Sequence, residues 1–276
     1  MLKVGVIIPT YKRALELDQC IKSLKKNTFT NFTIVVVNDC SDEEVSRILH
    51  VNHPECIEIT STTDLWWTKS INIGLRYLIN NKFDAAILLN DDITVESGFI
   101  DSMMGFFLEH QDNILISRII DQDNRIWSIG GDVSWPFYGE RHISPEYQEN
   151  SISWSPGMGT LVPLKVVNQI GYLDELAMPQ YLSDADFGLR ATRNGWTILL
   201  NNSSVVRNNT LSTGGILGKN KLTLKDFRFI LFNFRSPDYI KARFIFIFRH
   251  APVGLKTISF MTRQLKLLIY FVRRFR

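Results

Sequence analysis

KVGVIIPT, residues Lys3–Thr10, is an apolar run rich in Val and Ile that ends in Pro-Thr. Such a run is typical of a strand that helices cover on both faces of a sheet. The next segment has Leu17, Ile21 and Leu24 at helical spacing, which predicts an amphipathic helix. A buried strand followed by such a helix is the repeating unit of a parallel sheet.

The same unit recurs through the first hundred residues. Apolar runs predict further strands at residues 32–39, 56–61 and 85–90. Helical patterns follow these strands at residues 41–50, 67–81 and 97–110. Ser41 is the predicted N-cap of the first of these helices. Four units with short connections predict an α/β fold with a mainly parallel central sheet flanked by helices.

Beyond residue 115 the pattern changes to short strands and turns, followed by helical patterns at residues 164–175 and 184–196. Residues 197–210 then predict either a pair of strands or a strand and an extended segment. The composition, 45% hydrophobic and 21% charged, is typical of a globular protein. Three cysteines without metal-ligand spacing favour reduced thiols in a cytosolic protein. No apolar run is long enough to predict a membrane span.

Polar clusters stand where predicted strands end, and ligands of parallel sheets bind beyond the carboxyl ends of the strands. Asn90-Asp91-Asp92 is the most acidic of these clusters. Adjacent carboxylates are costly to bury unless a cation neutralises them, and Mg²⁺ or Mn²⁺ with a phosphate-bearing substrate would do so. A polar turn that ends the strand is an equally valid interpretation.

Two further clusters have a catalytic and a structural interpretation each. Asp184 and Asp186 precede Arg190 in a predicted helix, so one carboxylate could act as a general base. Alternatively, Asp186 and Arg190 form a helical ion pair. Asp39 follows a strand, where it could hydrogen-bond a heterocycle or simply form a turn. No GxGxxG or P-loop pattern is present, which disfavours dinucleotide dehydrogenases and P-loop NTPases.

Five segments in this order resemble the inverting family 2 glycosyltransferases of the GT-A fold, over residues 3–215. The segments are VGVIIPTYKR, VVVNDCSDE, LLNDDITV, GTLVPLKVVNQIGYLDE and YLSDADFGLRATRNGW. The resemblance implies a catalytic domain at residues 1–218, with a nucleotide-binding half (1–115) and an acceptor-binding half (116–218). Residues 219–276 would then form a basic helical extension.

The resemblance also implies roles for single residues. Asp184 would be the general base, and Asp92 would bind a divalent cation, Mn²⁺ or Mg²⁺, that bridges the donor diphosphate. Asp39 would read the base of the donor, a UDP- or dTDP-sugar. The other donor-binding residues implied are Pro9, Thr10, Tyr11, Arg13, Lys69, Asn72, Asn90, Asp91, Arg190 and Arg207.

The sequence departs from the family pattern at three positions. Asn90 stands where the family has the first carboxylate of its metal motif. Ser183 replaces the acidic residue before the base, which leaves Asp186 as a rival base. Arg207 stands near the position where the family often has a histidine, and it could neutralise the diphosphate directly.

The last 58 residues are strongly basic. Residues 219–276 contain 14 Lys and Arg and two Asp, whereas residues 1–218 contain 17 Lys and Arg and 26 Asp and Glu. A helix from Ile258 would place apolar side chains on one face, which is typical of a helix at an anionic membrane surface. The apolar residues of this face are Met261, Leu265, Leu268, Val272 and Phe275. Packing on the catalytic domain or on a second copy in a homo-oligomer is the alternative, and the acidic body disfavours nucleic acid.

The leading hypothesis is therefore an inverting hexosyl- or rhamnosyl-type transferase that acts on a glycan or lipid-linked acceptor. It would be cytoplasmic, peripheral on the inner face of the cell membrane, and would serve synthesis of a bacterial surface polysaccharide. A nucleotidyltransferase is a rival enzyme, but PTYKRALEL lacks the glycines of its phosphate loop. A non-catalytic binding module with this fold is the second alternative, which Asn90 and Ser183 keep open.

Overall fold

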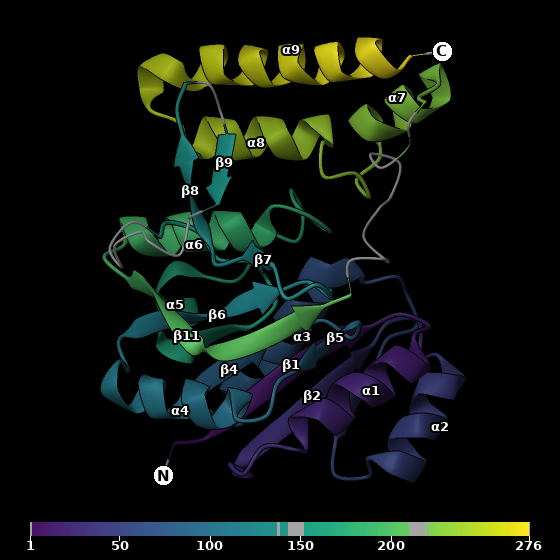
Figure 1. Cartoon of the computed structure of the whole chain (residues 1–276), viewed down its shortest axis with the longest axis vertical. Coiled ribbons are helices and arrows are strands. Elements are labelled where there is room, and N and C mark those ends of the chain that lie inside the picture. Colours follow the sequence, from purple (N-terminus) through teal and green to yellow (C-terminus); the bar gives the residue numbers. More distant parts are fainter. Residues whose placement is uncertain (1, 137–138, 143–151, 210–218, 220, 276) are drawn as a thin grey trace.

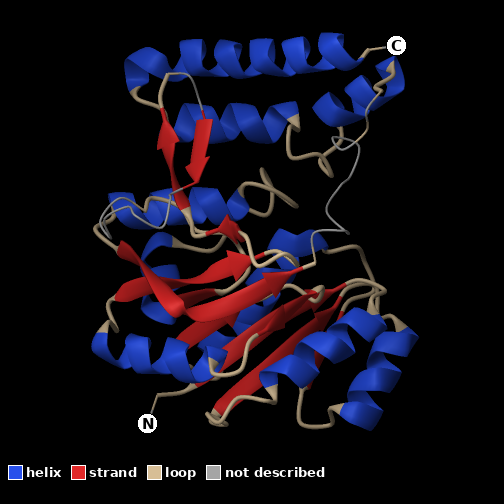
Figure 2. Ribbon diagram, viewed as in Figure 1, coloured by secondary structure: helices blue, strands red, loops and turns tan. Residues whose placement is uncertain are grey.

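The computed structural model describes residues 2–136, 139–142, 152–209, 219 and 221–275. Its main sheet has the order β3-β2-β1-β4-β10-β6-β11-β5, with β7 beside β6. The strands are β1 (Val4–Thr10), β2 (Phe32–Asn38), β3 (Ile57–Thr60), β4 (Ala85–Leu88), β5 (Ile93–Val95), β6 (Asn113–Ile120), β7 (Ile126–Ser128), β10 (Thr160–Pro163) and β11 (Thr197–Asn208). Strands β1 to β4 are parallel, β10 is antiparallel to β4 and β6, and β11 is parallel to β6. The predicted mainly parallel α/β sheet is confirmed (Figure 2).

Helices cover both faces of this sheet (Figure 1). They are α1 (Ala14–Leu24), α2 (Glu43–Asn52) and α4 (Phe99–Glu109) on one face, and α3 (Trp66–Asn80), α5 (Leu164–Ile170) and α6 (Ser183–Arg193) on the other. Side chains of a strand alternate between the faces, so Val6 and Ile8 pack with α1 whereas Ile7 packs with α3. The continuous apolar run of β1 therefore follows from burial on both sides.

Two local predictions were wrong. The N-cap of α2 is Asp42, whose side chain accepts a hydrogen bond from the Val45 amide, and not Ser41. Cys40 and Ser41 both have positive φ, so the chain turns for two residues before the helix begins. Residues 197–208 form one strand, β11, with a bulge between Asn201 and Val205, rather than two segments.

The C-terminal region adds a further layer beyond α6 (Figure 1). It comprises α7 (Leu224–Phe232), α8 (Ile240–His250), a short 3₁₀ turn (Val253–Leu255) and α9 (Lys256–Arg274). Phe246 and Ile247 of α8 pack into one hydrophobic cluster with Leu189 of α6 and Val133 of β8 (Gly131–Ser134). Strand β8 pairs with β9 (Gly139–His142) in a two-stranded antiparallel sheet. Helix α9 lies outermost, on α8. Within the described ranges, no helix combines the length and the apolarity that crossing a membrane requires.

Candidate active site

A cavity of about 770 Å³ opens at the carboxyl ends of β1, β2 and β4. The predicted site residues that line it are Pro9, Thr10, Tyr11, Arg13, Asp39, Asn90, Asp91, Asp92 and Asp184. The first eight come from the carboxyl ends of three neighbouring parallel strands and the loops that follow them, and Asp184 comes from the first turn of α6. The sheet edge therefore gathers residues that are far apart in the sequence, as expected for this kind of sheet.

Asp91 and Asp92 lie in the turn between β4 and β5, as the turn interpretation predicts, and both also line the cavity. Arg13 pairs with Asp92 at 2.7 Å and with Asp91 at 3.4 Å. The Thr10 hydroxyl donates to the second Asp91 oxygen at 2.8 Å. Burial raises the pKa of Asp91 to about 6 in spite of these partners. The acidic turn is thus partly neutralised by a guanidinium from the protein itself.

Asn90 is held by a tryptophan of α3. The Trp67 indole N–H donates to the Asn90 side-chain oxygen at 3.0 Å. Trp67 in turn lies against Gly157, where a Cβ would stand 2.3 Å from the indole ring. A glycine is required there because any side chain would displace Trp67 and, through it, Asn90.

Asp39 orients the segment that leads into α3. Its two carboxylate oxygens accept the backbone N–H groups of Leu65 and Trp66 at 2.8 and 3.1 Å. Next to it, the Cys40 thiol donates to Asp64 at 2.7 Å, and that bond raises the pKa of Cys40 to about 11. The side-chain ligand atoms of Asp39, Cys40 and Asp64 lie within 4.8 Å of one another, a group that could hold a metal ion.

Asp184 is half-buried and lines the cavity. Its two oxygens accept the backbone N–H groups of Gly157 and Ala185 at 2.9 and 2.8 Å. Leu182, just before α6, has a positive φ that turns the chain into the helix. The carboxylate is therefore held in place by two backbone donors.

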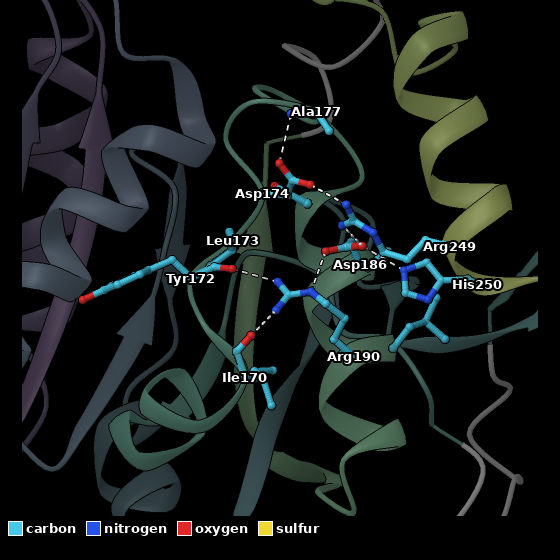
Figure 3. Close-up of polar contacts among 12 residues, drawn as sticks. Ile170, Tyr172, Leu173, Asp174, Ala177, Asp186, Arg190, Arg249 and His250 are labelled. Carbon is cyan, nitrogen blue, oxygen red and sulfur yellow. Dashed lines mark hydrogen bonds and ion pairs between the residues drawn. The ribbon is translucent and has the colours of Figure 1, made fainter.

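Asp186 lies outside the cavity, in a buried cluster between α6 and α8 (Figure 3). Its carboxylate accepts hydrogen bonds from Arg190, Arg249 and His250 at 2.7–2.8 Å. Burial alone would raise the pKa of Asp186, but these donors lower it to about 2. Desolvation by burial lowers the pKa of His250. The cluster joins α6 to α8, and of the two candidate bases only Asp184 lines the cavity.

The structure does not bring four predicted donor-binding residues to the cavity. Arg190 bonds Asp186 and the carbonyls of Ile170 and Tyr172. The buried side chain of Asn72 holds the backbone of Leu173. Lys69 is exposed on α3 outside the cavity lining.

Arg207 is the fourth of these residues. It pairs with Glu96 at 2.8 Å and donates to the Asp121 carbonyl, away from the cavity. Strand β11, which carries Arg207, is antiparallel to β5, and this pairing places Arg207 opposite Thr94. Neighbouring charges of the fold, rather than a ligand, therefore satisfy Arg190 and Arg207.

Several lining residues were missed from the sequence. They are Asp64, Ser70, Trp127, Gln180, Tyr181, Phe229, Arg235, Ser236 and Pro237. The last four belong to the C-terminal region, which the charge pattern sets apart as an extension outside the catalytic domain. Only the aromatic and basic composition of that region gave a signal for them, and composition does not fix which residues reach a site built by much earlier parts of the chain.

The charged side chains that line the cavity in the described part of the chain are five carboxylates and two guanidinium groups, a formal charge of −3. A bound diphosphate would add further negative charge, so such a ligand needs a compensating cation. Carboxylate and amide oxygens are the ligand atoms that Mg²⁺ and Mn²⁺ take in proteins. The donor set of the cavity therefore fits a hard divalent cation.

Comparison with known sequences identifies the domain. Residues 5–160, more than half of the chain, match the Glycosyl transferase family 2 domain. A Haemophilus influenzae protein described as an uncharacterized glycosyltransferase is 32% identical over 89 residues. That match covers 32% of this chain and 29% of the relative, so the chain aligns with under a third of that protein's length.

Solved structures share the fold at low sequence identity. S. aureus TarS matches with a TM-score of 0.65 and 17% identity, over 99% of this chain and 55% of TarS. TarS 1–349 in complex with UDP-GlcNAc matches with a TM-score of 0.61 and 18% identity, over 99% and 90% of the two chains. GalNAc-T7 with UDP, GalNAc and Mn²⁺ matches with a TM-score of 0.60 and 12% identity, over 76% and 44%. With the domain match over residues 5–160, the chain belongs to glycosyl transferase family 2.

Proposed function

We propose that the protein transfers a hexosyl or rhamnosyl group, with inversion, from a nucleoside-diphosphate sugar to an acceptor hydroxyl. The observation that carries this proposal is that Asp184 and the Arg13–Asp91–Asp92 cluster line the same cavity. A direct displacement needs a general base and a charged site for the phosphate groups at the same cavity. The UDP-GlcNAc complex of the structurally similar TarS supports UDP- or dTDP-sugars as the first donors to test.

Asp184 is the proposed general base. It takes the proton of the acceptor hydroxyl while the oxygen forms a bond to the anomeric carbon. The bond from that carbon to the diphosphate oxygen breaks on the opposite face, and its electron pair leaves with the nucleoside diphosphate. The backbone N–H groups of Gly157 and Ala185 fix the carboxylate in one orientation, which saves reorganisation during the reaction.

Asp92, with Asn90 and Asp91 beside it, is the proposed holder of a divalent cation, Mn²⁺ or Mg²⁺. Such a cation would neutralise charge on the leaving diphosphate. Arg13, which already bridges Asp91 and Asp92, limits the charge that the cation must balance. Asp39, Tyr11, Thr10 and Pro9 form the remaining wall on the donor side.

The direct test is release of nucleoside diphosphate from UDP- and dTDP-sugars, with and without Mn²⁺. Asp184→Asn should lower kcat by roughly 10²- to 10⁴-fold, because the base is lost, and should leave UDP binding nearly unchanged. Asp123→Asn, which changes an exposed carboxylate outside the cavity, is the matched control and should retain full activity.

Three outcomes would contradict parts of the proposal. Loss of UDP binding in the Asp184→Asn protein would make Asp184 a donor ligand instead of a base. Formation of UTP or dTTP together with a sugar 1-phosphate, when inorganic pyrophosphate is added to the same donors, would indicate a nucleotidyltransferase. Nucleotide binding without turnover of any donor, in a folded protein, would indicate a non-catalytic binding module.

We further propose that the acceptor is lipid-linked or another surface glycan, and that the enzyme acts on the cytoplasmic face of the cell membrane. The support is α9 with its C-cap residue, where the apolar residues Met261, Leu265, Leu268, Val272 and Phe275 are each 46–64% exposed. Lys256, Arg263, Lys266 and Arg274 lie roughly opposite this uncovered face, and an apolar face backed by a basic one suits an anionic membrane surface. A second copy of the chain is the alternative occupant of the face.

A further inference from the structure

The loop between α7 and α8 brings an arginine to the cavity from a part of the chain that lies beyond the matched domain. Arg235 lines the cavity together with Phe229, Ser236 and Pro237. Its guanidinium lies over the ring of Trp66, 5.4 Å from the ring centroid. Phe234 meets the same ring edge-on at 4.8 Å. Trp66 thus fixes the place of this loop on the cavity wall.

The loop is anchored on both sides of Arg235. The Arg235 amide donates to the Asn233 side chain at 2.9 Å, and the buried Ser236 hydroxyl accepts the amide of Asp238. Asp238 pairs with Arg243 and Arg263, which belong to α8 and α9. The fold therefore already orders the backbone of Arg235, so ligand binding loses little further conformational entropy there.

Arg235 differs from the other arginines near the site. Arg13 is engaged by Asp91 and Asp92, and Arg190 and Arg207 point away to partners of their own. Within the described ranges, the Arg235 guanidinium has no carboxylate partner and makes its contact with an aromatic face. A guanidinium that stacks on a ring keeps its N–H donors available for a planar bidentate contact with phosphate.

We propose that Arg235 is a substrate-binding residue that binds a phosphate group of the substrate. This inference rests on the proposed function, in which the donor carries a diphosphate. Its position favours the donor, because the backbone N–H of Trp66 also bonds Asp39, on the wall where the nucleotide is proposed to bind. A phosphate of a lipid-linked acceptor offers the same chemistry from the other substrate. The C-terminal region would then complete the site.

The test measures binding of UDP and of inorganic pyrophosphate by titration calorimetry, and the KM for the acceptor, in the full chain. Arg235→Met keeps an apolar side chain over Trp66 but removes the charge. It should weaken phosphate binding roughly 10- to 100-fold, while Arg235→Lys should lose less. Arg228→Ala, at an exposed arginine of α7 outside the cavity, is the control and should bind as the wild type does.

The two binding measurements also assign the phosphate. Weaker UDP and pyrophosphate binding with an unchanged acceptor KM assigns the phosphate to the donor. Unchanged UDP and pyrophosphate binding with a raised acceptor KM assigns it to the acceptor. Unchanged values for all three in Arg235→Met would overturn the proposal. If the wild type transfers no sugar but Arg235→Met still loses pyrophosphate binding, the glycosyltransfer proposal fails and the phosphate site stands. Equal melting temperatures of the variants would show that folding is not the cause.

Discussion

At the scale of single residues, the acidic turn is a compromise between burial and charge. Asp91 is 6% exposed, and Thr10 and Arg13 stabilise its carboxylate. Burial still raises its pKa from 3.8 to about 6. Burying an ionised carboxylate destabilises the fold, so its presence here points to a functional need for negative charge. Binding a cation or a cationic side chain is such a function.

This raised pKa predicts a particular dependence of stability on pH. The folded-state pKa of Asp91 lies above its unfolded value, so its favourable contribution is complete below about pH 4. That contribution is lost as the pH rises through 6, since the unfolded chain then releases the proton more readily. The difference in free energy of unfolding between Asp91→Asn and the wild type should therefore shift by roughly 3 kcal/mol in favour of the variant from pH 4 to pH 7.5.

Urea unfolding at a series of pH values, with EDTA present to remove divalent cations, measures this difference. Asp123→Asn serves as the control, because its exposed carboxylate should give a curve parallel to that of the wild type. Parallel curves for Asp91→Asn as well would show that Asp91 is not strained by burial.

At the scale of elements, α6 serves the cavity on one face and the C-terminal region on the other. Asp184 and Asp186 are two residues apart, about 200° around the helix, so their side chains leave in opposite directions. Arg190 is one turn beyond Asp186 and shares its face, which explains why it bonds Asp186 and not a ligand. Helix α6 thus carries the proposed base on one face and contacts α8 with the other.

The buried cluster predicts a large stability effect. Asp186→Asn removes the charge that Arg190, Arg249 and His250 surround, and it leaves two guanidinium groups without their buried counter-ion. Breaking a buried ion pair in this way costs about 3–5 kcal/mol. The free energy of unfolding, from urea titration at pH 7, should fall by roughly that amount. Asp123→Asn, at an exposed ion pair, should change it by less than about 1 kcal/mol, and equal values for both variants would contradict the prediction.

At the scale of the whole molecule, the basic extension has two surfaces with different tasks. Its inner surface packs Phe246 and Ile247 against α6 and brings Arg235 to the cavity. Its outer surface is α9, with a narrow buried edge at Ser259, Leu267 and Phe271 and a broad exposed apolar face. Removing the extension would therefore disturb the site as well as any membrane contact, so point substitutions on α9 are the sharper test.

The exposed face of α9 predicts binding to anionic membranes. Leu265→Asp with Val272→Asp should reduce sedimentation with vesicles that contain phosphatidylglycerol, because the change removes apolar contact and adds repulsion. Added salt should weaken wild-type binding, since each basic residue near an anionic surface contributes about 1 kcal/mol that salt screens. Leu15→Asp with Val51→Asp, at exposed apolar positions of α1 and α2, is the matched control and should bind as the wild type does.

Two results would contradict the membrane proposal. One is equal sedimentation of both double variants. The other is a wild-type dimer that Leu265→Asp with Val272→Asp converts to a monomer, without any vesicle binding, which would assign the face to a second copy.

Most of the sheet and the principal clusters could be predicted from the sequence, because periodicity and turn chemistry are local properties. The apolar run of β1, the repeated units after it, and the acidic turn at the end of β4 are all encoded within short stretches of chain. The position of ligands beyond parallel strands then placed Asp39 and Asp91 at one edge, and the structure has both on one cavity. Helical geometry alone also separates Asp184 from Asp186, because residues two apart in a helix face opposite ways.

Which charged groups share the cavity depends on tertiary packing. Arg13, Arg190, Arg207 and Arg235 are alike in a sequence, yet two of them line the cavity and two are bound to partners elsewhere. Their partners lie up to 111 positions away, so the outcome depends on how distant segments pack and not on local pattern. Local pattern is enough to specify the sheet, its acidic edge and the basic C-terminal region. Packing of that region against α6 is what brings an arginine from it to the site, because contacts between distant elements exist only in the folded chain.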